Sequence, residues 1–577
     1  MKNAQVAKIL YEIADMLEMQ DVQFKPQAYR RAARNIESLA KPIEDVAKGG
    51  VEELMKIPGV GESIAEKVEE IVATGRLKYY EELKKKFPIK IDEMFTVEGL
   101  GPKKIRLLYK KLGIKTLDEL EAAAKAGKLR KLPGMGEKSE KQILESIEFA
   151  RGRGQRVLLG LILPVAGEIK EKMKASNLVD VVEVAGSIRR MKETIGDIDI
   201  LAVTKQHQHP AKVMDYFTSL PNVDAIVSKG PARSTVRLKE GIECDLRVFE
   251  KHQFGAALMY FTGSKDHNIE LRKVAIKHGC KLNEYGLFDV RGKTEKQIAG
   301  ATEEEVYKKF GMQYVPPEMR ENTGEIELAL KNKLPKIIGY DDVRGDLQMH
   351  TKWSDGQNTV EEMSRAAKAL GYEYICISDH VGTLQIAGGL NAKELAQQKK
   401  EIEKAQKKIP GIKILQGAEV NILSNGKLDM KDSVLKELDV VVGSIHGGFR
   451  QSGEQITHRI VSAMENDNVD IIAHPTGRQI QKRKPYEVDL EKVFEVAKRT
   501  GTLLEINSYP DRLDLNADNV RRAVELGCRL VIDTDAHSAE HLRYMQLGIA
   551  TARRGWAEKK DVVNTLPLKE MMKTLKK

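Results

Sequence analysis

From residue 344 onward, short apolar strands alternate with longer charged helices, and this alternation restricts the fold more than any other feature of the sequence. The predicted strands cover residues 374–377, 440–443, 471–473, 503–506 and 530–532. Strand–helix repeats form parallel sheets, and a closed ring of such repeats is a βα barrel. Because the chemistry of these barrels lies at the carboxyl ends of the strands, we expect a functional site there.

Histidine and carboxylate residues follow these strands one after another. A single histidine after a strand is most often a structural hydrogen-bonding group, but five of them interleaved with carboxylates are hard to explain in that way. Imidazole and carboxylate ligands suit Zn, Mn or Fe, and bridged metals suit phosphoester hydrolysis. We therefore predict a polynuclear metal site. The motifs are Asp346–His350 with Asp355, Ser378–His380, Gly417–Glu419, Gly443–His446, Ala473–His474 and Asp533–His537.

A second candidate metal site lies in the stretch Val184–Leu201. The chain turns at Gly186 and Ser187, and the following strand carries Asp197 and Asp199. Residues two apart on a strand share a face, so both carboxylates point the same way. A glycine turn that opens a helix also suits a phosphorylated ligand. The alternative is a solvated aspartate pair at the end of a strand.

Asp245 lies in the middle of another predicted strand, at 241–249, among apolar neighbours. Aspartates are seldom buried unless they are paired or bind a metal. Asp245 could therefore complete a carboxylate trio with Asp197 and Asp199. Such a trio would hold two divalent cations that activate an attacking hydroxyl and neutralise a leaving pyrophosphate.

Residues 3–150 read as short amphipathic helices, and one motif recurs in them three times. It is hydrophobic-x-Gly-hydrophobic-Gly followed by a helix, at residues 57–61, 97–101 and 132–136. In this helix-hairpin-helix pattern a glycine turn exposes backbone N–H groups, which bind a phosphate oxygen without reading a base. The predicted DNA-backbone contacts are Gly59, Gly61, Gly99, Gly101, Gly134 and Gly136. The formal net charge of +10 favours a polyanionic partner.

Lys67 follows the first of these turns. A lysine in that place is usually a phosphate contact. It can instead form a Schiff base with a sugar aldehyde when neighbouring cations lower its pKa. The residues alone leave both interpretations open.

Composition limits the remaining choices. The four cysteines are scattered without a CxxC pair, which predicts a reducing compartment. The N-terminus lacks a signal-peptide pattern, and the longest apolar run, 157–167, is broken by Pro164. We expect a cytoplasmic, monomeric protein that does not enter a membrane.

Several spaced motifs together resemble the family X DNA polymerases, which include DNA polymerase beta. They are Gly186-Ser187-x-Arg189-Arg190, Gly196-Asp197-x-Asp199, Asp245, Tyr260–Ser264 and Asn283–Tyr285. The resemblance implies that Asp197, Asp199 and Asp245 bind Mg²⁺ or Mn²⁺ at the catalytic site. It places Gly186, Ser187, Arg190 and Gly196 at the triphosphate and Tyr260 and Phe261 beside the nucleotide sugar, with Gly263 as a further nucleotide contact. Asn268 and Arg272 would touch the nascent base pair, and Lys67 would be a deoxyribose-phosphate lyase nucleophile supported by Lys25 and Tyr29.

The C-terminal part resembles the PHP (polymerase and histidinol phosphatase) domain, and the order of the parts resembles bacterial and archaeal PolX enzymes. This resemblance implies two or three Zn²⁺ or Mn²⁺ ions. The implied ligands are His350, Asp355, His380, Glu419, His446, His474, Asp535 and His537. Gln348 stands where the family has the first histidine of an HxH motif, and glutamine is a weaker, neutral ligand.

Together these observations predict a multidomain α+β chain. The expected parts are a helical lyase-like domain (1–90), a helix-hairpin-helix region (91–155), a nucleotidyltransferase palm with a mixed sheet (156–255), a thumb-like subdomain (256–315), a linker (316–343) and a PHP barrel (344–577). We expect a repair polymerase that uses deoxynucleoside triphosphates on gapped or nicked duplexes. The barrel would act as a 3′–5′ exonuclease, abasic-site endonuclease or 3′-phosphatase. The alternative is a PHP-type phosphoesterase brought to DNA by a weakly active or inactive polymerase half.

Overall fold

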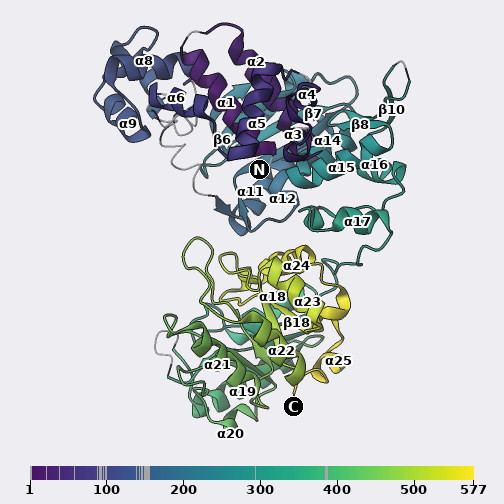
Figure 1. The fold of residues 1–577 in the computed structure, drawn as a ribbon. Helices are drawn as coiled ribbons and strands as arrows, with labels where there is room; N and C mark the ends of the chain where they lie inside the picture. The colour runs from purple at the N-terminus through teal and green to yellow at the C-terminus, as the bar shows by residue number, and fades with distance from the viewer. Residues whose placement is uncertain are drawn as a thin grey trace. The chain divides into compact units, whose positions relative to one another are not determined.

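The chain divides into two compact units. The first comprises Met1–Arg156 with Leu238–Ile242 and Asn268–Lys281, and the second comprises the rest of the chain. Figure 1 labels many of the helices and strands named below. The computed structural model describes residues 3–576 apart from 21, 38, 40, 58, 87–88, 90–93, 95–96, 98–99, 138, 142, 145–146, 148–155, 293 and 384–387.

The N-terminal part of the first unit is helical. Apolar residues three and four apart, such as Val6, Leu10, Ile13 and Leu17, are buried on one side of α1 and belong to one shared core. The helices are α1 (Asn3–Met19), α2 (Lys25–Glu37), α3 (Ile43–Ala47), α4 (Gly50–Met55), α5 (Glu62–Thr74), α6 (Lys78–Lys86), α8 (Pro102–Leu112), α9 (Leu117–Lys125) and the 3₁₀ helix η1 (Leu129–Lys131).

The palm of the second unit is built on a five-stranded mixed sheet in the order β2-β4-β7-β6-β5. Its central strands β4 and β7 are parallel, whereas β2 is antiparallel to β4 and β6 is antiparallel to β7. Ile198 and Ile200 are fully buried, so the alternation in β4 points one face into the core. The elements are β1 (Val157–Leu158), α11 (Leu159–Ala175), β2 (Val179–Val184), α12 (Gly186–Arg189), β3 (Thr194–Ile195), β4 (Asp197–Thr204), α13 (Pro210–Thr218), β5 (Val223–Lys229), β6 (Arg233–Leu238) and β7 (Glu243–Phe249).

A three-stranded sheet and four α-helices follow the palm. The sheet has the order β10-β9-β8. The elements are α14 (Phe254–Thr262), α15 (Lys265–Lys277), β8 (Cys280–Asn283), β9 (Gly286–Asp289), β10 (Lys296–Ala299), α16 (Glu303–Lys309), η2 (Pro317–Met319) and α17 (Glu325–Leu330). Most of α15 belongs to the first unit.

The segment 316–343, which we expected to be a linker, is packed rather than extended. Glu318, Arg320 and Glu325 are buried in it, although its prolines and charges are typical of an exposed boundary. Arg320 donates to Glu303 of α16 at 2.6 Å. The start of this segment therefore packs against the thumb-like subdomain. The ion pair between Arg320 and Glu303 keeps it there in spite of its polar composition.

Glu303 is the centre of a buried ion-pair network. It accepts hydrogen bonds from Arg189 at 2.7 and 2.9 Å, from Arg320 and from the Tyr314 hydroxyl. Burial alone would raise the pKa of Glu303, but the charges of Arg320 and Arg189 lower it to about 2. The network joins α12, which carries the glycine turn, to α16.

Substituting Glu303 with Gln is expected to lower the free energy of unfolding by about 3 kcal/mol, because the buried Arg320 and the half-buried Arg189 lose their counter-charge. The contribution of Glu303 is fully present above pH 4.5, the ordinary pKa of a glutamate, and falls as the pH approaches about 2. Thermal melts at pH 7 and pH 3 should therefore show a larger difference between wild type and Glu303→Gln at pH 7. Glu304→Gln, at the exposed neighbouring position, is the control, and equal losses for both variants would contradict the prediction.

The C-terminal part of the second unit is the predicted barrel. All its strand pairs are parallel, in the order β11-β12-β14-β15-β16-β17-β18, with β13 beside β14. A parallel bridge between Met349 and Ala536 brings the two ends of the sheet together. The strands are β11 (Gly345–Met349), β12 (Tyr374–Ile377), β13 (His380–Val381), β14 (Lys413–Asn421), β15 (Val440–Ser444), β16 (Ile471–Ile472), β17 (Leu503–Asn507) and β18 (Leu530–Asp533).

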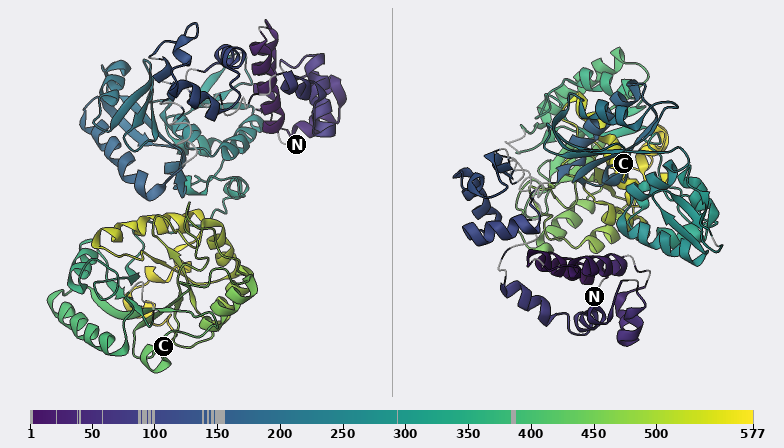
Figure 2. Two further views of the ribbon diagram at one scale, coloured as in Figure 1. Left: turned by 90° about the vertical axis from the view of Figure 1, so that its left-hand side faces the viewer. Right: turned by 90° about the horizontal axis from the view of Figure 1, so that it is seen from above.

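Helices surround these strands (Figure 2). Three of them begin at capping boxes in which Thr359, Asn391 or Ser452 accepts a backbone N–H of the first turn. The elements are α18 (Val360–Ala369), α19 (Ala392–Lys408), α20 (Asp432–Leu435), α21 (Gly453–Met464), α22 (Leu490–Thr500), α23 (Ala517–Leu526), η4 (Ala539–Tyr544), α24 (Met545–Arg554), η5 (Lys559–Asp561), η6 (Val563–Thr565) and α25 (Leu568–Met572). None of the helices that the structure describes has the length and apolarity needed to span a bilayer.

Candidate metal centres and nucleic-acid interface

The three palm aspartates lie on two adjacent strands. Asp199 on β4 is in register with Asp245 on β7, and Asp197 is in register with Glu243. In parallel strands that share a register, side chains of paired residues lie on the same face. The fold thus brings Asp245 beside the pair that the sequence had placed together.

The carboxylates differ in their surroundings. Burial, and then the negative charges of Asp197 and Asp245, raise the pKa of Asp199 to about 7. Asp245 accepts hydrogen bonds from Thr235 at 2.5 Å, Arg247 at 2.7 Å and Arg233 at 3.0 Å. Crowded carboxylates of this kind fit divalent cations, whose charge would remove the repulsion that raises the pKa of Asp199.

The glycine turn between β2 and α12 lies directly beside Asp199. Gly186 has φ +61°, and a Cβ built on it would lie 2.5 Å from Asp199 Oδ2, so only glycine fits. Ser187 Oγ is buried and has no hydrogen-bond partner among the described residues. Buried hydroxyls are normally hydrogen-bonded, so Ser187 fits a contact to an absent ligand. Gly196 is exposed immediately before Asp197.

Arg190, the last residue of this turn, is fixed from two sides. Its Nε donates to Glu321 at 3.1 Å, and its guanidinium also donates to the carbonyl of Thr262. Arg554 of α24, in the barrel, donates to the same Glu321 oxygen at 3.1 Å and to the backbone carbonyl of Arg190 at 2.8 Å. A barrel residue therefore helps to hold the segment predicted to bind a triphosphate.

The other predicted nucleotide contacts are distributed over two helices. Tyr260 is 39% exposed, and its ring packs edge-on against Phe261 with centroids 5.1 Å apart. Gly263, with φ +69°, caps α14 next to Arg190. Asn268 and Arg272 lie one turn apart on α15, and Arg272 Nε donates to the carbonyl of Asn268 at 3.3 Å. These two residues belong to the first unit, whereas Tyr260, Phe261 and Gly263 belong to the second.

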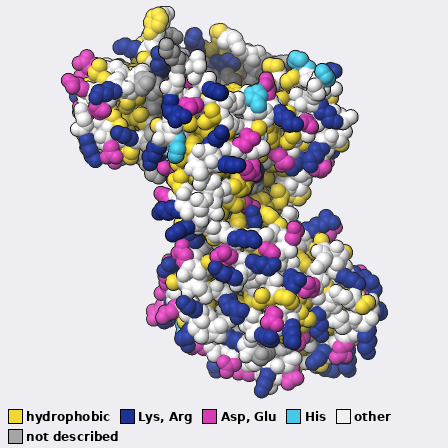
Figure 3. Space-filling view, turned by 90° about the vertical axis from the view of Figure 1, so that its right-hand side faces the viewer, with side chains coloured by type: hydrophobic (Ala, Val, Ile, Leu, Met, Phe, Trp, Pro, Cys, Tyr) yellow, Lys and Arg dark blue, Asp and Glu magenta, His cyan; other side chains and the backbone are white. Residues whose placement is uncertain are grey.

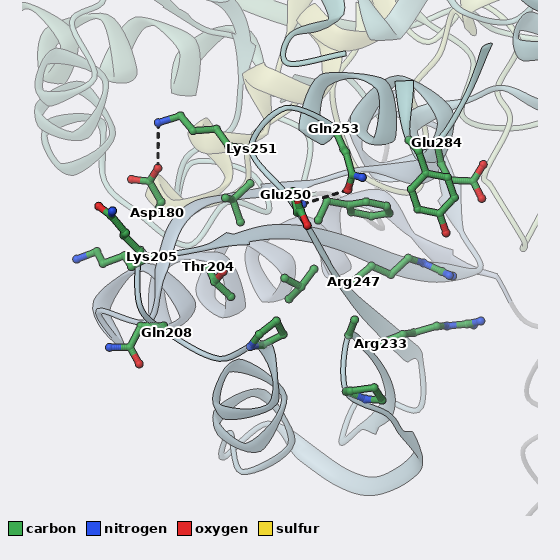
Figure 4. Close-up of a pocket in the computed structure, with 18 of the residues that line it drawn as sticks. Asp180, Thr204, Lys205, Gln208, Arg233, Arg247, Glu250, Lys251, Gln253 and Glu284 are labelled. Carbon is green, nitrogen blue, oxygen red and sulfur yellow. Dashed lines mark hydrogen bonds and ion pairs between the residues drawn. The ribbon is translucent and has the colours of Figure 1, made fainter. Parts of the chain in front are cut away.

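A cavity of about 1240 Å³ opens on the palm on the side of Arg233 and Arg247. Both arginine side chains extend in the same direction at its edge (Figure 4). Arg247 also lies over the ring of Phe261, with 4.5 Å from Cζ to the centroid. Two of the three side chains that donate hydrogen bonds to Asp245 therefore also line an open, partly basic hollow.

In the barrel, all eight predicted ligands come together. Glu419 is at the centre: one of its oxygens lies 3.3 Å from His350 and 3.4 Å from His380, and the other 3.2 Å from His446 and 3.3 Å from His474. The remaining contacts join His350 to Asp535 at 3.1 Å, His380 to Asp355 at 3.8 Å and His537 to Asp355 at 3.5 Å.

The ligand atoms form three overlapping groups, each with all its atoms within 4.8 Å of one another. The groups are His350, Asp355, His380 and His537; His380, Glu419 and His446; and His350, Glu419 and Asp535. Buried polar atoms without a hydrogen-bond partner gather here, including His350 Nδ1, His380 Nδ1 and one oxygen of Glu419. Donors of these types left unpaired in one buried cluster fit metal ions.

Gln348 lies on β11, two residues before His350, and neither side-chain polar atom of this fully buried glutamine has a hydrogen-bond partner among the described residues. The unpaired amide oxygen therefore fits the role of a neutral metal ligand. Burial alone would raise the pKa of Asp355. The hydrogen bond with His537 and the charges of His350 and His380 instead lower the pKa of Asp355 to about 2.

The three glycine motifs of the first unit share one turn geometry. Val60 donates its N–H to Ile57, Leu100 to Val97 and Met135 to Leu132, at 3.0, 3.2 and 3.1 Å. Gly59 and Gly134 have positive φ, and Gly61 and Gly101 cap α5 and α8 without a side-chain cap. Among the residues that the structure describes, no atom outside the glycine and its two chain neighbours lies within 4 Å of the position that a Cβ would take at Gly61, Gly101, Gly134 or Gly136. A phosphate can therefore approach the N–H groups of these turns. Gly99 lies outside the described residues.

Lys67 lies on α5, just after the first turn. Its Nζ donates to the carbonyl and to the hydroxyl of Ser63 at 2.8 and 2.9 Å and lies 5.1 Å from the centre of the Tyr79 ring. Tyr29 is buried, and burial together with Tyr79 raises the pKa of Tyr29 to about 12. Lys25 is exposed. The lyase role of these residues stays a prediction.

Two features escaped sequence reasoning. Arg233, Thr235 and Arg247 supply the positive charge and hydrogen bonds around Asp245; pairing of β6 with β7 brings Thr235 opposite Asp245, and only the sheet register reveals it. In the barrel, Arg512 Nε lies 3.5 Å from Asp535 Oδ2. No motif in the sequence marks this arginine.

The surface shows no simple mark of a nucleic-acid interface on the face in Figure 3. There, Lys and Arg side chains of the barrel, in the lower half of the view, are interspersed with Asp and Glu. DNA binding is therefore indicated by the glycine turns and the arginines of the sites more than by net charge.

Family models match four parts of the chain. A helix-hairpin-helix domain matches residues 1–77, a SAM-like helix-hairpin-helix tandem matches 91–148, the DNA polymerase beta thumb matches 257–321 and the PHP domain matches 346–509. The class is thus a polymerase-like chain joined to a PHP barrel, as the sequence predicted.

Comparison with similar proteins identifies the family within this class. The chain is 37% identical over 580 residues to DNA polymerase/3'-5' exonuclease PolX of Bacillus subtilis, with 100% of both chains covered. A probable phosphatase of Thermoanaerobacter pseudethanolicus is 34% identical over 207 residues, which cover 33% of this chain and 78% of that protein. A probable phosphatase of Acetivibrio thermocellus is 30% identical over 201 residues, with 33% and 78% covered. The chain belongs to the PolX family.

Proposed function

We propose that this chain is a DNA repair polymerase that fills short gaps and that its PHP barrel removes nucleotides from DNA 3′ ends. The observation that carries the first half is the pairing of Asp199 with Asp245 beside the unpartnered Ser187 hydroxyl. These residues are proposed to bind Mg²⁺ or Mn²⁺, which would supply activation of the primer hydroxyl and neutralisation of the leaving pyrophosphate.

The chain's own residues hold the nucleotide. Ser187 donates its unused hydroxyl to the triphosphate, and Arg190 supplies a positive charge whose direction Glu321 fixes. Arg233 and Arg247 hold Asp245 in place through its carboxylate. The helix-hairpin-helix turns bind the backbone of a gapped or nicked duplex without base selection.

The barrel residues are proposed to hold two or three Zn²⁺ or Mn²⁺ ions, which would supply a nucleophile at neutral pH. Arg512 is proposed to meet the scissile phosphate, because this cation lies at the edge of the ligand cluster. The proposed activity is 3′–5′ exonuclease; cleavage at abasic sites and removal of a 3′-phosphate use the same chemistry. A cytoplasmic location and a monomeric state complete the proposal.

One preparation of the full chain tests both halves. With a one-nucleotide gapped duplex and nucleotides it should extend the primer, and with a single-stranded 3′ end and no nucleotides it should shorten the strand. Metal analysis of the purified protein should find Zn or Mn. Strand shortening without any extension would favour the rival function, a phosphoesterase with an inactive polymerase half.

A further inference from the structure

An aromatic cluster stands beside the barrel's metal-ligand residues and belongs to none of the three candidate ligand groups. Tyr509 lies on the loop after β17, and His541 and Tyr544 lie on η4 after β18. All three therefore follow the carboxyl ends of strands, on the catalytic face of the barrel.

The three rings form one continuous platform. Tyr509 meets His541 and Tyr544 edge-on, with centroids 5.3 and 5.4 Å apart, and His541 stacks on Tyr544 at 5.1 Å and 21°. The platform begins at the ligand cluster, because Tyr509 lies 6.4 Å from the ring of His537 and His541 Nδ1 accepts the His537 N–H at 3.3 Å.

Packing of the core does not account for these rings. Side chains three apart eclipse one another on a 3₁₀ helix, so η4 has two distinct faces. Leu542 on η4 and the following Met545, the first residue of α24, are buried in the barrel core, whereas His541 and Tyr544 are only half-buried. Neither tyrosine hydroxyl has a hydrogen bond within the part of the chain that the structure describes.

Two arginines lie close in sequence to the residues of the platform. Arg512 is three residues from Tyr509 and lies 3.5 Å from Asp535, and Arg543 is exposed on η4 between the two ring-bearing positions. Aromatic faces combined with cations are the means by which proteins bind single-stranded nucleic acid, with stacking on the bases and charge on the backbone.

We propose that Tyr509, His541 and Tyr544 stack on the nucleobases at the 3′ end of a single DNA strand and so deliver its terminal phosphodiester to the ligand cluster. This inference rests on the proposed nuclease function of the barrel and names the part of the substrate that the site selects. A small phosphoester has no base to place on the platform and gains nothing from it.

The test compares two substrates of the full-length protein: a single-stranded oligonucleotide and the small aliphatic diester diethyl phosphate, which has no ring to stack. Tyr544→Ala should raise KM for the oligonucleotide about ten-fold, the size expected for loss of one stacked base. It should leave kcat/KM for the small diester within two-fold, whereas Tyr544→Phe should behave as wild type on both substrates. Equal losses on both substrates would show a structural role and overturn the proposal, as would unchanged KM for the oligonucleotide.

A change in the substrate provides an independent arm. An oligonucleotide whose last two nucleotides lack bases should bind wild type about ten-fold more weakly, and Tyr544→Ala should weaken it no further. Additive effects of the two changes would overturn the stacking proposal. If wild type cleaves neither the oligonucleotide nor the diester, the proposed nuclease function itself fails, and that outcome is distinct from loss of the platform alone.

Discussion

Asp199→Asn is expected to reduce primer extension on a gapped duplex by roughly a thousand-fold, equivalent to about 4 kcal/mol of transition-state stabilisation. Asp199 is two residues from Asp197 on β4 and in register with Asp245, and burial together with the charges of these two aspartates raises the pKa of Asp199 to about 7. A neutral amide removes the central negative charge from the trio while it preserves the shape of the side chain. Single-turnover nucleotide incorporation measures the loss.

The matched control is Asp180→Asn, an exposed aspartate on β2 of the same sheet. It should extend primers at the wild-type rate. Strand shortening by the barrel should be unchanged in both variants, since neither residue belongs to the barrel. Survival of extension in Asp199→Asn would show that the palm assignment is wrong.

Glu419→Gln is expected to have the opposite effect, with strand shortening reduced at least a hundred-fold and primer extension unchanged. The two Glu419 oxygens lie within 3.4 Å of four histidines. An amide offers one acceptor oxygen and one NH₂ donor in their place, so it cannot bridge two metal-binding groups. We also expect the purified variant to contain less metal, which elemental analysis would measure.

Glu403→Gln, on the exposed side of α19, is the control for this experiment. The double variant His446→Ala, His474→Ala should reproduce the loss, because both histidines contact the same Glu419 oxygen. Retained nuclease in either ligand variant would contradict the assignment of the barrel site.

The sequence predicted the parts of both sites that depend on local periodicity. Asp197 and Asp199 share a face because strands alternate, and the histidines of the barrel converge because parallel strands end at one rim. The pairing of Thr235 with Asp245 depends on strand register, which residues far apart in the chain determine together. The burial of Arg320 against Glu303 is likewise a long-range contact, and local composition made its segment look like a linker.

The aromatic platform shows the same limit. His541 and Tyr544 are three apart in a short 3₁₀ helix, a spacing that an α-helical pattern also contains. Tyr509 reaches them from another loop, more than thirty residues earlier in the chain. The predicted barrel places these loops on one rim, but the contact of the three rings depends on the fold of the loops themselves.

The hydrogen bond from Arg554 to the carbonyl of Arg190 has a consequence for how this protein can be dissected. A shortened chain that ends before residue 344 would lack Arg554 and so lose that donor. Of the three ion-pair partners that Glu321 has among the described residues, Arg190 and Lys192 would remain. The shortened enzyme would have a loosened arginine at the triphosphate, and its nucleotide affinity would not be that of the parent. The barrel thus also stabilises the palm segment that ends at Arg190, and a chain without the barrel would need another contact to hold that segment.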